Sequence, residues 1–154
     1  MKKWCMIAVA VSVFGCGVKL DEADVEACEH IVEAGKALTA TATMSGAPAL
    51  TDDHERNDLA LVDVSGGKGG FAAFTVLENG DYLFYLDTDV PMEILNSAGV
   101  PVAFEKTEKS ISACKEVKAK YTVGLMLGTY SLRLGPTSET QVSLIVEHGE
   151  HSEE

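Results

Sequence analysis

Val117-Lys118-Ala119-Lys120-Tyr121-Thr122-Val123-Gly124-Leu125-Met126-Leu127 is the most regularly patterned stretch of the chain. Its apolar side chains recur at every second position from Val117 to Leu127, and Lys118, Lys120 and Thr122 fall between them. A period of two predicts a β-strand with one face in the protein core and the other in solvent. We therefore expect antiparallel sheets in which each strand buries one face.

The same alternation recurs on both sides of this stretch. Tyr130, Leu132 and Leu134 are expected to face inward in a strand that begins at Gly128, and Val142, Leu144 and Val146 in the last strand. Turn sequences such as Asn79-Gly80 separate further short strands, which we expect at residues 38–44, 58–64, 71–77, 81–86, 91–95 and 100–104. Together these patterns predict a mainly β protein, an antiparallel β-sandwich of about eight strands with one short N-terminal helix.

The helix is expected over Asp21–Ala34. Asp21 is a suitable N-cap residue, and Gly35 suits the C-terminal end. The apolar side chains recur at helical spacing and form one face, which consists of Val25, Cys28, Ile31 and Val32. Cys28 is therefore expected to face the body of the protein.

A glycine-rich stretch, Ser65-Gly66-Gly67-Lys68-Gly69-Gly70, lies between two expected strands. A phosphate-binding loop needs Ser or Thr after the Gly-Lys pair and a helix behind it. Here Gly69 follows Lys68, and the strand at 71–77 comes next. We expect a hairpin connection at this position.

Size and charge narrow the class of protein. The chain has 154 residues, a length that suits one domain with a core of its own. Its formal net charge is −12. A surface with this much negative charge repels nucleic acids and anionic lipid head groups. We therefore expect no nucleic-acid partner. We divide the chain into a signal peptide (1–15), a lipidated tether (16–20), a helix and sandwich domain (21–147) and an acidic, His-containing tail (148–154).

The N-terminus carries the pattern of a secretion signal. Met1-Lys2-Lys3 is basic, residues 4–14 are an apolar run, and Val13-Phe14-Gly15-Cys16 closes the run. The run is too short to span a bilayer, which takes about 20 apolar residues. These sixteen residues resemble the signal of bacterial lipoproteins processed by signal peptidase II. The resemblance implies cleavage before Cys16, lipidation of Cys16 and anchoring in the cell envelope. Gly17 favours the outer membrane, and an ordinary secretion signal is the alternative.

Two further cysteines, Cys28 and Cys114, follow the lipidation box. An oxidising envelope favours a disulfide between them. Such a bridge closes a loop of about 86 residues, and the chain-entropy model gives it about 4.5 kcal/mol of stabilisation. A thiolate metal pair is the alternative, although no CxxC spacing supports it.

Two similar segments, Gly80-Asp81-Tyr82-Leu83-Phe84 and Gly128-Thr129-Tyr130-Ser131-Leu132, flank an Asn96-Ser97-Ala98-Gly99 turn. Over roughly residues 55–147, this arrangement resembles the small secreted β-sandwich domains found at the C-terminal ends of bacterial peptidases, the pre-peptidase C-terminal-like domains. The resemblance implies a binding or accessory module and not a catalyst.

All four histidines of the chain have carboxylate neighbours. His30 follows Glu29, His54 follows Asp52-Asp53, and His148 and His151 form a His-x-x-His motif beside Glu147 and Glu150. Imidazole and carboxylate together suit zinc, copper or nickel. If the strand after His54 pairs antiparallel with the last strand, His54 lies close to His148. We interpret His148, His151, His54 and His30, in that order, as candidate metal ligands.

The chain contains no Gly-x-Ser-x-Gly elbow and no His-Glu-x-x-His helix motif. We therefore expect a non-catalytic, lipid-anchored binding protein of the cell envelope that binds a transition metal ion. The alternative for each histidine is an exposed or structural role. The alternative for the whole chain is an interaction module that binds another envelope protein.

Overall fold

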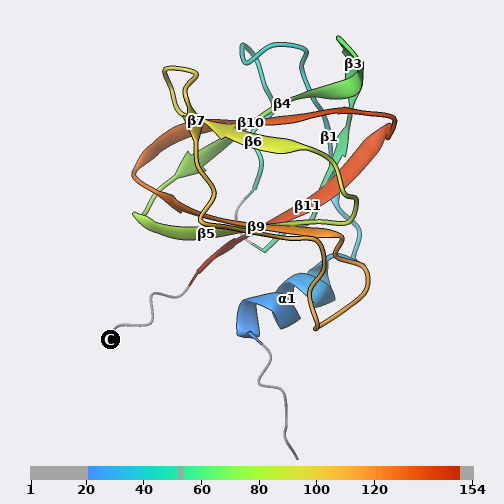
Figure 1. Ribbon diagram of the computed structural model, residues 1–154, viewed down its shortest axis with the longest axis vertical. Helices are drawn as coiled ribbons and strands as arrows, with labels where there is room; N and C mark the ends of the chain where they lie inside the picture. The colour runs from blue at the N-terminus through green and yellow to red at the C-terminus, as the bar shows by residue number, and fades with distance from the viewer. Residues whose placement is uncertain (1–20, 52–53, 150–154) are drawn as a thin grey trace, which may run out of the picture.

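The computed structural model describes residues 21–51 and 54–149 and shows a β-sandwich with one helix packed beneath it (Figure 1). The first sheet has six strands, in the spatial order β1 (Lys36–Thr39), β2 (Asn57–Ala60), β11 (Gln141–His148), β5 (Gly80–Leu86), β9 (Ala119–Leu125) and β8 (Lys106–Glu108). The second sheet has five, in the order β3 (Val62–Val64), β4 (Gly67–Val76), β10 (Gly128–Thr137), β6 (Met92–Leu95) and β7 (Pro101–Val102).

The expected fold class is confirmed, with eleven strands among the described residues instead of about eight. All the pairings between named strands are antiparallel except that of β1 with β2, which is parallel. The core between the sheets contains Phe74, which packs edge-on against Phe84 at a ring-centroid distance of 5.5 Å. Strand alternation drives this arrangement, because every second side chain of β4, β5 and β10 enters the same layer.

Helix α1 (Glu22–His30) covers the outer face of the first sheet (Figure 1). Its N-cap is Asp21, whose carboxylate accepts a hydrogen bond from the Ala23 amide. Ala27 and Ile31 enter a second apolar cluster, whose sheet residues are Leu83, Tyr85, Val117 and Ile145. The helix is shorter than expected, and Val32 is 65% exposed and not part of the apolar face. The helix therefore adds a third layer to the sandwich.

A disulfide joins Cys28 of α1 to Cys114, with 5.9 Å between the two Cα atoms. This is the pairing expected from the sequence. Cys114 lies in the segment that precedes β9, and both cysteines pack against the second apolar cluster. The bond ties the nine-residue helix to the sheet that it covers.

Four sequence-based expectations about the strands are wrong. The strand expected at residues 38–44 is β1, which ends at Thr39. Residues 58–64 do not form one strand, because the chain changes sheets at Leu61, whose amide donates to the Thr140 carbonyl. Residues 106–108, where no strand is expected from the sequence, form edge strand β8, which pairs with β9. Leu127, expected to face inward, lies beyond the end of β9 and is 64% exposed.

Lys120 does not face solvent as the alternation suggests. It is 6% exposed, because α1 covers this face of β9. Its ammonium group lies 2.5 Å from Asp24 Oδ1, which also accepts a hydrogen bond of 2.8 Å from the Tyr85 hydroxyl. Burial, together with the Asp24 carboxylate, raises the pKa of Tyr85 well above its ordinary value. This network pairs the buried lysine with a carboxylate of the helix.

Among the described residues, no helix combines the length and the apolar character that crossing a membrane requires.

Candidate metal site

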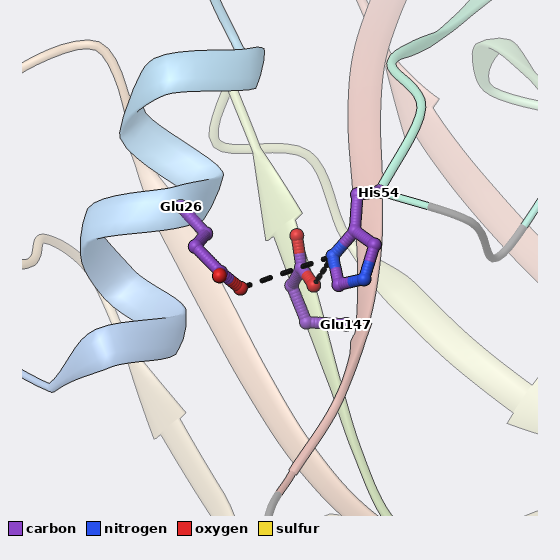
Figure 2. Close-up of side chains that lie close together, drawn as sticks. All are labelled: Glu26, His54 and Glu147. Atoms are coloured by element: carbon purple, nitrogen blue, oxygen red, sulfur yellow. Dashed lines mark ion pairs between the residues drawn. The ribbon is translucent and has the colours of Figure 1, made fainter.

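Glu26, His54 and Glu147 come together where α1 meets the end of β11 (Figure 2). One ligand atom from each residue lies within 4.8 Å of the ligand atoms of the other two. His54 Nδ1 forms an ion pair with Glu147 Oε2 and lies 3.9 Å from Glu26 Oε2. Two such ligand atoms on one tetrahedral zinc ion are about 3.4 Å apart, given zinc–ligand distances of about 2.1 Å. The three side chains are thus close to the spacing of a metal site.

Glu147 is the buried member of this group. Its side chain is 1% exposed, against 46% for Glu26 and 50% for His54. Among the described residues, Glu147 Oε1 is the one fully buried side-chain oxygen without a hydrogen-bond partner. Burial raises the pKa of the Glu147 carboxyl, and the neighbouring His54 opposes this rise. An unpaired buried carboxylate oxygen is costly and calls for a cation or a proton.

Strand alternation explains why Glu147 points toward the helix. Val142, Leu144 and Val146 face the core between the sheets, so Ser143, Ile145 and Glu147 face α1. Glu26 reaches the same place from the helix (Figure 2). Two surfaces that are separate in sequence therefore bring their carboxylates to one point.

The loop that carries His54 is held by a buried amide. Asn57 is fully buried, and its Nδ2 group donates to the carbonyls of Thr51 and Glu55, both at 3.1 Å. Its Oδ1 atom accepts from the amide and the hydroxyl of Thr51, again at 3.1 Å. His54 has a φ of 56°, a left-handed conformation that costs a residue with a side chain on the order of 1 kcal/mol. The structure thus keeps the imidazole in place at some cost to the backbone.

A second set of polar contacts ties the loop to the end of the helix. Arg56 donates to the Ile31 carbonyl at 2.5 Å and to Asp58 Oδ1 at 2.7 Å. Asp58 Oδ1 also accepts from the Ser143 hydroxyl at 2.7 Å. A side chain at Gly35 would clash with Asp58, because an added Cβ would lie 2.6 Å from Oδ2. These contacts hold α1, the His54 loop and β11 in one arrangement.

Asp58→Asn is expected to lower the free energy of unfolding at pH 7 by about 1 kcal/mol. Burial alone would raise the pKa of Asp58, but the hydrogen bonds from Ser143 and Arg56, with the Arg56 charge, bring it below its ordinary 3.8. A carboxyl group whose pKa is lower in the folded protein than in the unfolded chain stabilises the fold when the pH is above its unfolded pKa. This contribution is lost as the pH falls through the pKa of the folded state. The difference between the proteins, measured by urea unfolding, should therefore shrink from pH 7 to pH 3. A difference that does not change with pH would show that Asp58 acts through its shape alone.

The exposed side of the three residues opens into an acidic hollow of about 450 Å³. Glu26 and His54 line it, together with the carboxylates of Asp21, Glu22 and Asp81. A concave surface with so many carboxylates attracts cations. The site is therefore open to solvent on one side and closed by Glu147 on the other.

The structure places the expected ligands as follows. β2 pairs antiparallel with β11, which meets the condition stated for His54, and His54 lies at the end of β11. The residue that it contacts is Glu147 and not His148, because His148 points to the other face of the sheet, where its ring lies 4.9 Å from that of Tyr82. The His30 ring lies 6.3 Å from the His54 ring. His151 and the lipidation residue Cys16 lie outside the described residues.

Sequence reasoning missed the two carboxylates as ligands. From the sequence, Glu147 is named only as a neighbour of the His148/His151 motif, and Glu26 is not among the candidate ligands. The available signal for Glu147 was its place on the same strand face as Ser143 and Ile145. That face, opposite Val142, Leu144 and Val146, was expected to be exposed to solvent. The cover provided by α1 turns this position into a buried one.

No protein-family model matches the chain, and no curated protein sequence is similar to it.

Proposed function

We propose that this chain is a lipid-anchored protein of the bacterial cell envelope that binds a divalent transition metal ion without catalysing a reaction. The lipidation box at Cys16 supports the anchor, and the Cys28–Cys114 disulfide suits an oxidising compartment. The observation that carries the metal-binding part is the buried, unpartnered Glu147 Oε1 beside His54 and Glu26.

The ligand set favours some metals over others. It offers imidazole nitrogen and carboxylate oxygen, while the sulfur atoms of Cys28 and Cys114 are engaged in the disulfide. This composition suits Zn²⁺, Ni²⁺ or Cu²⁺ better than Cu⁺, which prefers sulfur ligands. Two of the three side chains are about half exposed, so a bound ion exchanges with solvent. Such a site fits reversible metal handling better than a structural role.

The test is to count metal ions on the full-length protein, purified in detergent from an oxidising envelope and equilibrated with micromolar Zn²⁺, Ni²⁺ or Cu²⁺. We expect one ion per chain by mass spectrometry, and none for the Glu26→Gln/His54→Gln variant. The matched control is His148→Ala/His151→Ala, which should retain the ion. Retention by the first variant and loss by the second would place the ion in the C-terminal segment instead. No ion on the wild-type protein would refute metal binding.

A further inference from the structure

His30 lies beside the three proposed ligands. It is the last residue of α1 and follows Glu26 by four positions, so the two side chains share one face of the helix. Its ring centroid lies 6.3 Å from that of His54. The side chain is 32% exposed and keeps contact with water. The helix thus carries one carboxylate and one imidazole near His54.

The distance between the two imidazole rings is near the distance expected for two imidazoles that bind the same metal ion. With zinc–nitrogen distances of 2.0–2.1 Å and a tetrahedral angle, two coordinated imidazoles have their centroids about 5 Å apart. The observed distance is longer by about 1 Å, which a side-chain rotation of His30 or His54 supplies. His30 is at the helix end, where such a rotation meets little packing, as its partial exposure indicates.

Glu33 contacts the His30 ring at one nitrogen and leaves the other free of that contact. His30 Nδ1 lies 3.0 Å from Glu33 Oε2, within hydrogen-bond distance. In a neutral ring whose Nδ1–H group donates a hydrogen bond to the carboxylate, the lone pair is on Nε2. Metal-binding histidines usually have such a carboxylate or carbonyl partner on the nitrogen that does not bind the ion. Glu33 is therefore placed as an orienting residue for a His30 ligand.

We infer that His30 is the fourth ligand of the site. The site then binds Zn²⁺ in tetrahedral coordination by His30, His54, Glu26 and Glu147. The inference rests on the proposed metal-binding function and deepens it. Two imidazoles and two carboxylates complete a four-coordinate shell. Ca²⁺ and Mg²⁺ prefer shells made of oxygen ligands, whereas two of these four ligands are imidazole nitrogens. The site therefore discriminates against the two divalent ions that are most abundant around cells.

The experiment measures Zn²⁺ affinity on the full-length, oxidised protein by competition with a chromophoric chelator. The variants are His30→Gln, Glu33→Gln and Glu29→Gln. We expect His30→Gln to weaken Zn²⁺ binding at least about 100-fold and Glu33→Gln about 10-fold. Glu29→Gln is the matched control, because it removes the same charge next to His30 without touching the ring hydrogen bond. It should leave the affinity within about twofold of wild type.

Co²⁺ provides a second readout that a purely structural role of His30 would not change. Tetrahedral Co²⁺ absorbs visible light much more strongly than octahedral Co²⁺, so the wild-type complex should show intense bands and the His30→Gln complex weak ones. Ca²⁺ and Mg²⁺ in large excess should not displace the ion. Circular dichroism of the metal-free variants confirms that they are folded.

The outcomes separate the two proposals. If His30→Gln binds Zn²⁺ as tightly as wild type and keeps the Co²⁺ bands, His30 is not a ligand, and the three-ligand site stands. If Ca²⁺ displaces Zn²⁺ at comparable concentration, the assigned ion class is wrong. If the wild-type protein binds no ion, both the fourth ligand and the proposed function are refuted.

Discussion

Replacing both Cys28 and Cys114 with Ala is expected to lower the free energy of unfolding by about 4.5 kcal/mol. The disulfide spans 86 residues, and the chain-entropy model assigns a loop of this length about that stabilisation. A domain of this size has a total stability of about 5–15 kcal/mol, so the variant should be near the limit of folding at 37 °C. Guanidinium unfolding of the oxidised wild type and the variant, followed by tyrosine fluorescence, measures the difference.

The same variant should lose the order of α1 before the sandwich unfolds. A helix of nine residues is unstable alone, and α1 contributes mainly Ala27 and Ile31 to the second apolar cluster. Hydrogen exchange should therefore become fast over residues 22–31 while β5 and β11 stay protected. Because Glu26 comes from α1, Zn²⁺ affinity should fall as well. Wild-type protein treated with reductant is the control and should match the variant. A loss of stability below 1 kcal/mol would show that packing alone holds the helix.

The sandwich was predictable because its strands follow period-two alternation. In β9 and β10 this pattern identified inward side chains such as Val123, Leu132 and Leu134, which are all buried. The antiparallel pairing of β2 with β11 was only a condition in the sequence argument, and it brings His54 beside Glu147 instead of His148. Strand β8 was not predictable, because its pairing uses backbone groups that carry no sequence signal.

The candidate site was only half predictable. Its imidazole was identified from residue type, but its buried carboxylate depends on which face of the first sheet α1 covers. Lys120 and Glu147 were both assigned to solvent, and the helix buries both. Lys120 finds a partner in Asp24, whereas Glu147 Oε1 has none. Tertiary contact therefore decides which of these polar residues is structural and which is free to bind a ligand.

Glu147→Leu is expected to raise the free energy of unfolding of the metal-free protein by about 1–2 kcal/mol and to abolish its stabilisation by Zn²⁺. The substitution removes a buried carboxylate with an unpaired oxygen, and apolar replacement of buried charges is often stabilising. His54 is half exposed, so water solvates its ring once the partner is gone. Zn²⁺ at 100 times its Kd should stabilise the wild type by about 2.7 kcal/mol and the variant not at all. Urea unfolding with and without Zn²⁺ measures both effects.

Ser143→Ala is the matched control for this prediction. Ser143 lies on the same face of β11 and is as buried as Glu147, but its hydroxyl donates to Asp58. Its loss should lower stability by about 1 kcal/mol and leave the Zn²⁺ increment intact. The two substitutions should change the free energy of unfolding in opposite directions. This difference distinguishes a side chain that stabilises the fold from one that binds the ligand. If Glu147→Leu instead lowers metal-free stability by 3 kcal/mol or more, as breaking a buried ion pair does, Glu147 is a structural partner of His54. The metal site would then lose its main support.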